Sequence, residues 1–396
     1  MKIEELKIQG YRSLYDVTWK PGDLNVLIGP NASGKTNFLN FLKFLSLSAE
    51  GKLGDFIRKE GGFKAISWDE DGRNIMTKLK IISARRKTEP MSCYLLYIMG
   101  VKNKFFVLEE YLGKVFRGKS ALSISDKLTK DFVFSRRFRD STIINEKTNR
   151  KIDLVVDTPD ESLLSSGTGP FTPNKKINEF MKYFSSWSVY HTFSTDQNAQ
   201  IRMPSVSRYE YQVASDGQNL ISVLHTLYTT DREFKKELNN AMKVAFGDDF
   251  DELVFPPDAD QRVQLRLRWK SLKKERSAAD LSDGTLRFLL LMAVLANPKP
   301  APLIAIDEPE IGLHPSMLPI IAEFAVEASR KTQVIFATHS PEFLGAFRDT
   351  IPTTTVAKLN EGKTELKTIN GEDLSKWLKE YTLGELMKTG ELEAMG

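Results

Sequence analysis

Residues 29–36 read Gly29-Pro30-Asn31-Ala32-Ser33-Gly34-Lys35-Thr36, which is a complete Gly-x-x-x-x-Gly-Lys-Thr phosphate loop. In this motif the glycines permit a tight backbone whose N–H groups turn inward onto the phosphates of a nucleotide. Lys35 is placed to reach the β- and γ-phosphates, and the Thr36 hydroxyl is a ligand for Mg²⁺. The stretch therefore predicts a nucleotide site.

The sequence on both sides of the loop supports this prediction. Residues 24–28 are an apolar run of strand length, and residues 37–45 carry apolar side chains at helical spacing. Strand, glycine loop and helix, in that order, place the phosphates of a ligand at a helix N-terminus. A Gly-rich turn without a ligand would not need this context.

Composition limits the class of protein. The 396 residues include 41% apolar and 27% charged residues, which is ordinary for a soluble globular protein. Cys93 is the only cysteine, so an intramolecular disulfide framework and a Cys-rich zinc site are excluded, and a reducing cytoplasm is expected. The longest apolar run, residues 288–296, is too short to span a bilayer, so we expect a soluble protein with no membrane partner. A net charge of +4 does not by itself indicate nucleic acid.

A second constellation lies far away in the sequence. Residues 303–306 are apolar and are followed by Asp307 and Glu308, which describes a buried strand that delivers two carboxylates to its C-terminal edge. Asp307 is suited to hold Mg²⁺, usually through water, and Glu308 is suited to polarise an attacking water as a general base. A surface acidic turn is the alternative for this peptide taken alone.

Two shorter segments fit the same site. Ser282 is a natural N-cap for the long apolar helix expected over residues 284–296, and Gly284 lets the backbone approach an anion. His339 follows the apolar strand expected at residues 332–337, where it could contact a γ-phosphate. An ordinary capped turn and a capping or core histidine are the alternative interpretations.

Together these motifs are recognisable. Residues 29–36 (Walker A), 281–285 (a signature), 303–308 (Walker B), 312–315 and 338–340 resemble, in this order, the ATP-binding-cassette head ATPases. The match is best to the RecF/SMC-like, OLD-like group of AAA-family ATPases, and it spans nearly the whole chain. The resemblance implies an α/β P-loop NTPase of the ABC-ATPase head type. Its mixed β-sheet core would be flanked by helices and joined by an antiparallel β subdomain and a helical subdomain. Further matching pieces are residues 8–14, 215–220 and 383–386.

The resemblance also implies roles for single residues. The cofactors are ATP and Mg²⁺, the metal is held by Thr36 and Asp307, and Glu308 is the catalytic carboxylate with His339 as the switch histidine. Lys35 serves both phosphate binding and catalysis. The residues implied to bind ATP are Gly29, Asn31, Ser33, Gly34, Lys35, Thr36, Asn37, Ser282 and Gly284.

A partner subunit is implied as well. In such heads the signature serine and glycine contact the γ-phosphate of ATP held by the other subunit. Ser282 and Gly284 therefore imply a homodimer with ATP sandwiched between its two copies, or a higher oligomer built from that dimer. His314 belongs to the loop after Walker B, which crosses the dimer interface.

The chain departs from its relatives in three ways. The glutamine that senses Mg²⁺ in many of them is not located, although Gln197 and Gln200 are candidates. About fifty residues follow His339 and Ser340, too few for the nuclease domain of OLD nucleases, so no nuclease activity is expected of this chain. The sequence has no heptad stretch long enough for the coiled-coil arms of SMC proteins.

We expect residues 1–396 to form one composite head. Residues 1–114 would be an N-terminal lobe with Walker A and antiparallel strands, and residues 115–260 a loop-rich insertion and helical lobe. Residues 261–350 would hold the signature, Walker B and switch-histidine core, and residues 351–396 the C-terminal strands and helix. Within this scheme the helical patterns lie at residues 176–183 and 220–246, and a half-exposed strand with a basic face lies at residues 262–270.

Three functions remain open. The first is an ATP-driven switch that controls a separately encoded nuclease or toxin in a bacterial anti-phage system, by analogy with stand-alone relatives. The second is a RecF-like repair ATPase that binds DNA through the basic residues at 262–276, 136–139 and 85–87, although such charge runs are usually solvated faces. The third, less favoured, is the ATPase subunit of a transporter. A structural head that does not hydrolyse ATP is disfavoured because Glu308 is present.

Overall fold

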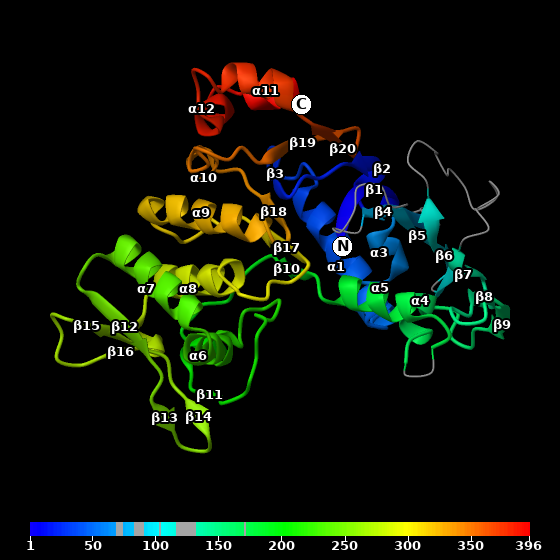
Figure 1. Ribbon diagram of the computed structural model, residues 1–396. Helices are drawn as coiled ribbons and strands as arrows, with labels where there is room; N and C mark the ends of the chain where they lie inside the picture. The colour runs from blue at the N-terminus through cyan, green and yellow to red at the C-terminus, as the bar shows by residue number, and fades with distance from the viewer. Residues whose placement is uncertain (69–73, 83–90, 103, 116–131, 170–171) are drawn as a thin grey trace.

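The computed structural model describes residues 1–68, 74–82, 91–102, 104–115, 132–169 and 172–396. Its centre is a six-stranded sheet with the order β10-β17-β18-β3-β19-β20 (Figure 1). The five strands from β10 to β19 are parallel, and β20 pairs antiparallel with β19. The strands are β3 (Leu24–Ile28), β10 (Ser188–Tyr190), β17 (Leu303–Asp307), β18 (Gln333–Ala337), β19 (Thr353–Asn360) and β20 (Lys363–Thr368).

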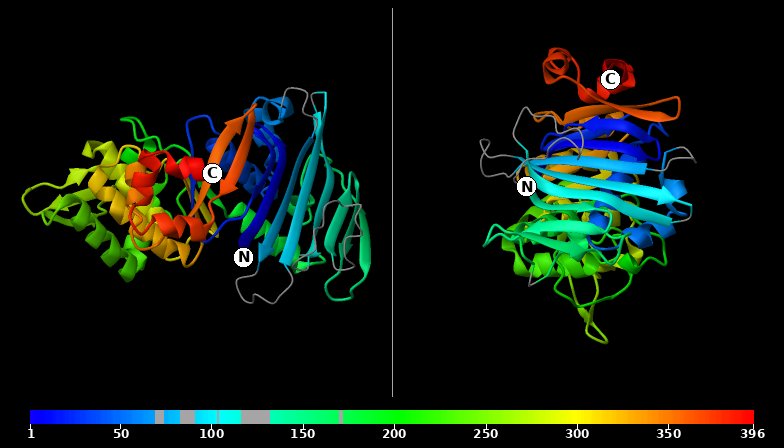
Figure 2. Two further views of the ribbon diagram at one scale, coloured as in Figure 1. Left: turned by 90° about the horizontal axis from the view of Figure 1, so that it is seen from above. Right: turned by 90° about the vertical axis from the view of Figure 1, so that its right-hand side faces the viewer.

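A second sheet, visible in both views of Figure 2, is antiparallel throughout. It has eight strands in the order β2-β1-β4-β5-β6-β7-β8-β9. Residues 132–155, expected in a loop-rich insertion, instead provide its last three strands. These residues form strands because their apolar side chains are buried in a core shared with the rest of the sheet; the buried side chains include Val133, Phe134 and Ile143. The strands are β1 (Lys2–Tyr11), β2 (Leu14–Trp19), β4 (Asn74–Ile82), β5 (Met91–Val101), β6 (Lys104–Val115), β7 (Phe132–Arg137), β8 (Asp140–Ile144) and β9 (Lys151–Val155).

Helix α1 (Lys35–Ala49), which follows the phosphate loop, is buried between the two sheets. Its phenylalanines share one hydrophobic cluster with side chains of both sheets, and the ring of Tyr11 on β1 meets that of Phe41 edge-on at 5.1 Å. This packing holds the start of α1 against the carboxyl edge of the parallel sheet. On its other side α1 is covered by α5 (Lys175–Ser185), which contains the helix expected at residues 176–183.

A helical lobe packs on the other face of the parallel sheet (Figure 1). The helical pattern expected at residues 220–246 is divided at Asp231, whose side chain accepts a hydrogen bond from the N–H of Phe234 and so begins a second helix. The lobe includes α6 (Leu220–Thr230), α7 (Arg232–Phe246), α8 (Asp283–Leu295), α9 (Leu318–Ser329), and the short strands β11 (Ser205–Val206), β12 (Phe250–Val254), β13 (Pro257–Asp258), β14 (Arg262–Val263), β15 (Arg266–Trp269) and β16 (Arg276–Ser277).

The basic strand expected at residues 262–270 is two strands in two different small sheets. β14 pairs with β11 and β13, whereas β15 pairs with β12 and β16. The remaining helices are short, and none of the described helices is long and apolar enough to cross a membrane. They are α2 (Leu53–Lys59), α3 (Phe63–Ile66), α4 (Leu163–Ser166), α10 (Pro341–Gly345), α11 (Gly371–Trp377), α12 (Leu383–Lys388) and α13 (Glu391–Met395), with 3₁₀ turns at Gln200–Arg202, Ala278–Asp280 and Pro315–Met317.

Candidate nucleotide-binding site

Three of the predicted site segments meet at the carboxyl edge of the parallel sheet. In the register of neighbouring strands Ala337 lies beside both Leu27 and Asp307, so the segments that follow β3, β17 and β18 emerge together. These segments are the phosphate loop, the acidic pair that begins at Asp307, and His339. Carboxyl ends of parallel strands are where α/β sheets bind ligands.

The loop backbone has the conformation that the motif requires. Gly29 and Gly34 have φ of 144° and 100°, which L side chains rarely adopt. A Cβ on Gly29 would lie 2.2 Å from the carbonyl oxygen of Ala357, and one on Gly34 would lie 2.0 Å from Oγ1 of Thr364. Only glycine fits at either position, and Gly34 directly precedes the first residue of α1.

Lys35 is buried at the mouth of this loop. Its Nζ donates hydrogen bonds to the carbonyl oxygens of Gly29 at 2.7 Å and Pro30 at 3.0 Å. Burial lowers the pKa of Lys35, and the nearby Asp307 and Glu308 oppose that shift. Ser33 Oγ is buried and has no hydrogen-bond partner among the described residues, which fits a loop built to receive acceptor oxygens.

Thr36 and Asp307, the two residues expected to hold Mg²⁺, lie in contact with each other. Thr36 Oγ1 donates a hydrogen bond of 2.9 Å to Asp307 Oδ2, which leaves the lone pairs of the hydroxyl available to a cation. A hydroxyl and a carboxylate oxygen are hard ligands of the kind Mg²⁺ takes, together with water and phosphate oxygens. The residues present therefore fit Mg²⁺. Of the other residues expected to bind ATP, Asn31 is exposed on the loop, and Asn37 donates to Ser13 Oγ at 2.8 Å, on the turn between β1 and β2.

Glu308 adopts a left-handed backbone with φ of 47°, which is uncommon for a residue with a side chain. Its N–H donates to the carbonyl oxygen of Ala337 at 2.7 Å, and this bond ties the turn to β18. The turn brings Glu308 Oε1 to 2.8 Å from Nδ1 of His339. Both side chains are partly exposed, so a carboxylate is held beside an imidazole where water can reach it.

The signature segment has the predicted local form. Ser282 Oγ accepts a hydrogen bond from the N–H of Thr285 and so caps α8. A Cβ on Gly284 would lie 2.7 Å from the carbonyl oxygen of Gly312, in the loop after Walker B. Ser282 is exposed, and no hydrogen bond of the described residues joins it or Gly284 to the phosphate loop of the same chain.

Sequence reasoning missed several residues at this edge. His191, which follows β10, has Nδ1 3.4 Å from Asp307 Oδ2, and a histidine directly after a short apolar run was the available signal. Glu310 accepts a hydrogen bond of 2.6 Å from Thr338 Oγ1, and burial raises its pKa. The two candidate glutamines, Gln197 and Gln200, are both exposed on the segment that leaves β10.

The basic stretches are less available than their composition indicates. Arg268 is paired with Glu252 and Glu275 at 2.5 and 2.8 Å, and Arg136 is fully buried in the antiparallel sheet. Residues 273–274 are exposed lysines, and no ion pair is described for them. Residues 85–87 lie outside the described residues.

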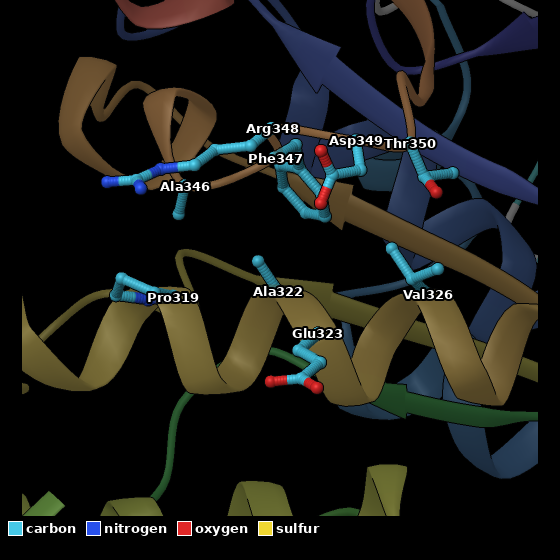
Figure 3. Close-up of a pocket in the computed structure, with 9 residues that line it drawn as sticks. All are labelled: Pro319, Ala322, Glu323, Val326, Ala346, Phe347, Arg348, Asp349 and Thr350. Carbon is cyan, nitrogen blue, oxygen red and sulfur yellow. The ribbon is translucent and has the colours of Figure 1, made fainter. Parts of the chain in front are cut away.

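A separate hollow lies between α9 and the segment that follows α10 (Figure 3). Ala322 and Val326 on α9 face Phe347 across it, and Arg348 and Asp349 lie on the segment above. None of the phosphate-loop, Walker B or signature residues lines it. The chemistry of the site therefore lies at the sheet edge rather than in this hollow.

Solved structures of other proteins share the fold of this chain. The solved structure titled "Crystal structure of the SmcHead bound to the C-winged helix domain of ScpA" has a TM-score of 0.60 and 13% identity, covering 95% of this chain and 100% of that one. An Smc head domain with an extended coiled coil, bound to the C-terminal domain of ScpA derived from Pyrococcus furiosus, has a TM-score of 0.55 and 12% identity, covering 96% and 99%. No curated protein matches.

These likenesses confirm the predicted fold, an ABC-type ATPase head with a mixed α/β core. The family model described as "AAA domain, putative AbiEii toxin, Type IV TA system" matches residues 24–83 and 124–345, which is more than half of the sequence. The match includes the phosphate loop, the signature, Walker B and His339. The chain therefore belongs to this family of AAA domains, and it has the fold of an SMC head.

Proposed function

We propose that the protein is an ATP-binding and ATP-hydrolysing switch that dimerises around ATP and controls a partner effector. The observation that carries the proposal is the pairing of Glu308 with His339 opposite a phosphate loop that begins a buried helix. A carboxylate held beside an imidazole at the end of the nucleotide cradle is placed to polarise a water for attack on a γ-phosphate.

The proposed roles within one chain follow from the contacts. Thr36 and Asp307 hold Mg²⁺, which would neutralise charge on the phosphates when bound. Lys35 leaves its two carbonyl partners to meet the β- and γ-phosphates, because anionic oxygens are stronger acceptors than carbonyls. Glu308 takes the proton of the attacking water, and His339 orients Glu308.

The proposed dimer follows from the signature. Ser282 and Gly284 are exposed or half-exposed at the N-terminus of α8, a helix of 13 residues, but they do not bond to the loop of their own chain. A helix N-terminus with an exposed serine is suited to an anion. We place it on the γ-phosphate held by a second copy, with His314 at the interface.

The effector is proposed to be a separately encoded nuclease or toxin in a bacterial defence system. The family name, which refers to a putative AbiEii toxin and a Type IV TA system, supports this context. Among the described residues no group of three or more His, Cys, Asp or Glu side chains could hold a further metal ion. We therefore expect the purified chain to leave nucleic acid uncut with Mg²⁺ or Mn²⁺, and cleavage that a point mutation in this chain abolishes would overturn the partner model.

A second candidate is a RecF-like ATPase that binds DNA itself. The exposed pair Lys273 and Lys274, in the turn between β15 and β16, is the observation that favours it. The paired arginines of β15 speak against a broad basic face.

The dimer is tested with the Glu308→Gln variant, which keeps the shape of the side chain but lacks the base. Light scattering should show more dimer with Mg²⁺-ATP than with Mg²⁺-ADP or without nucleotide. A variant that binds ATP and remains monomeric over the same protein concentrations would contradict the proposed switch.

A further inference from the structure

Strand β9 forms one end of the antiparallel sheet, at the far side of the molecule from the helical lobe (Figure 1). Among the described strands it pairs with β8 alone, so its other side is an open edge. Two apolar side chains are exposed on this strand, Leu154 by 43% and Val155 by 69%. The unpaired N–H and C=O groups of an open edge are a template for one more strand.

Two hydrogen bonds show which backbone groups of β9 face this open side. The carbonyl oxygen of Arg150 accepts from the N–H of Asn145 at 2.9 Å, and the N–H of Val156 donates to the carbonyl oxygen of Arg139 at 2.7 Å. Both groups therefore point toward β8. In an antiparallel ladder the N–H and C=O of one residue face the same neighbour, and successive residues alternate. The odd-numbered residues of β9 thus present their N–H and C=O groups outward.

The side chains of β9 alternate between the two faces of the sheet. Ile152 lies opposite Ile143, which is buried in the core, so Ile152 is on the core-facing side. Lys151 and Asp153 are on the outer side, and both are exposed. Asp153 accepts a hydrogen bond of 2.6 Å from Thr142 of β8. Neither charged side chain has an ion-pair partner in the described part of the chain, so both charges are available to a neighbour.

Charged residues on an edge usually keep other strands away, but these two complement a second copy of the strand. When two copies run antiparallel with Ile152 opposite itself, Lys151 of each copy lies opposite Asp153 of the other. Both residues face outward, so their N–H and C=O groups would exchange hydrogen bonds as well. Moving the two-fold axis to Lys151 or to Asp153 would instead place like charges opposite each other, which is unfavourable.

We propose that β9 pairs in this register with β9 of a second copy and joins the two antiparallel sheets into one continuous sheet. The two-fold axis is perpendicular to the sheet, so the core-facing sides of both copies stay on the same side. This contact needs no nucleotide and does not rest on the proposed ATP sandwich. A chain with both contacts has two separate self-complementary surfaces, and ATP would then link nucleotide-free pairs into larger assemblies.

The first test is sedimentation velocity of the full chain with EDTA and without nucleotide, over a series of protein concentrations. The unmodified protein should show monomer and dimer in an equilibrium that depends on concentration. A monomer at every concentration up to the solubility limit would overturn the proposal. Failure of Glu308→Gln to associate further with ATP would contradict only the proposed switch, because the β9 contact is measured without nucleotide.

Exchange of the charges tests the register. Lys151→Asp makes both positions acidic and Asp153→Lys makes both basic, so each variant alone should associate about tenfold more weakly. An equal mixture of the two should restore the dimer, because acidic positions of one copy then lie opposite basic positions of the other. A mixture that associates no better than its components would overturn the register.

Two further variants separate the register from overall charge. The double variant with both exchanges keeps the net charge of the chain and the complementary pairs, so it should associate like the unmodified protein. Asp140→Lys, on β8 rather than on the edge, changes the net charge as Asp153→Lys does and should leave the dimer intact. A double variant that stays monomeric, or an Asp140→Lys protein that loses the dimer, would contradict the proposed pairing.

Proline tests the backbone hydrogen bonds of the contact. Lys151→Pro and Lys151→Gln both remove the ammonium group, but only proline also removes an outward-facing N–H. That N–H does not bond to β8, so circular dichroism and thermal unfolding should show that the fold is kept. Proline should weaken the dimer more than glutamine does, and equal association of the two variants would contradict strand pairing.

Discussion

The imidazole of His339 lies 2.8 Å from the carboxylate of Glu308, measured from Nδ1 to Oε1. The two residues follow neighbouring parallel strands, and the left-handed backbone of Glu308 turns its side chain toward the histidine. A strained residue at a sheet edge persists only where its surroundings hold it, and here the bond from its N–H to Ala337 does so. This pair is the basis of the first prediction.

Glu308→Gln and Lys35→Ala should impair ATP hydrolysis in different ways. The Glu308 variant loses the base, so turnover should fall by about a hundredfold or more while ATP stays bound. The Lys35 variant loses a buried cation of the cradle, so binding and turnover should both fall. Fluorescent-nucleotide binding and phosphate release measure the two quantities, and near-normal turnover in Glu308→Gln would refute the assigned base.

Ser282→Arg should abolish hydrolysis but leave ATP binding by the single chain largely intact. The serine caps α8 and does not bond to the phosphate loop of its own chain, so its proposed action is on the partner's nucleotide. Removal of one preorganised donor from a transition state typically lowers turnover by about 10² to 10³. A loss of binding as large as the loss of hydrolysis would show that the signature assignment is wrong.

If the protein binds DNA, the exposed lysines should account for the salt dependence. Lys273→Ala with Lys274→Ala should reduce the slope of log affinity against log salt by about 0.9 for each DNA phosphate that the protein no longer neutralises. The matched control is Arg266→Ala with Arg268→Ala, because both arginines already have Glu275 within ion-pair distance. Equal slopes in the unmodified protein and in both double variants would indicate that residues 262–276 are a solvated surface that does not contact DNA.

The buried Glu110 predicts how stability depends on pH. Its carboxylate accepts from Ser162 Oγ at 2.7 Å and from the N–H of Leu163 at 2.5 Å, and burial raises its pKa above the ordinary value of 4.5 although Arg136 opposes the shift. The folded state therefore holds this proton more tightly than the unfolded state. Its contribution to the free energy of unfolding is complete below pH 4.5 and is lost as the pH rises through the raised pKa.

Glu110→Gln, which cannot titrate, is the comparison that isolates this contribution. Urea unfolding of both proteins should show the difference in unfolding free energy, unmodified protein minus variant, falling with rising pH. The decline should be no steeper than about 1.4 kcal/mol per pH unit, the limit for one proton. A difference that stays constant or grows with pH would contradict the raised pKa.

Much of the nucleotide site could be predicted from local sequence. The phosphate loop, the capping serine of α8 and the paired carboxylates after β17 are each short segments whose chemistry depends on neighbours in the chain. The order of these segments was enough to indicate the fold, which the likeness to Smc heads confirms. Roles that depend on a second copy of the chain stay predictions.

The residues that sequence reasoning missed or misplaced are those whose partners lie far along the chain. Arg202 resembles any surface arginine until its carbonyl partners near residues 278–281 are seen. Arg136 belongs to a basic run that suggested DNA binding, yet it is buried beside Glu110. Successive side chains of a strand point to opposite faces of the sheet, and in β7 Arg136 lies on the buried face whereas Arg137 is exposed. Strand pairing decided the environment of each charge, and composition did not reveal it.

The sequence by itself therefore determined the motifs and their order, because hydrophobic periodicity, helix caps and glycine backbone freedom are local properties. Only the tertiary structure decided that His191 reaches Asp307 and that Arg202 holds the signature. The first contact depends on the parallel pairing of β10 with β17. The second joins Arg202 to carbonyl groups that lie almost eighty residues further along the chain, and burial of the shared core brings the two segments together. Local sequence preferences decide whether a residue lies in a helix, a strand or a turn, whereas burial of the hydrophobic core decides which residues from distant parts of the chain it contacts.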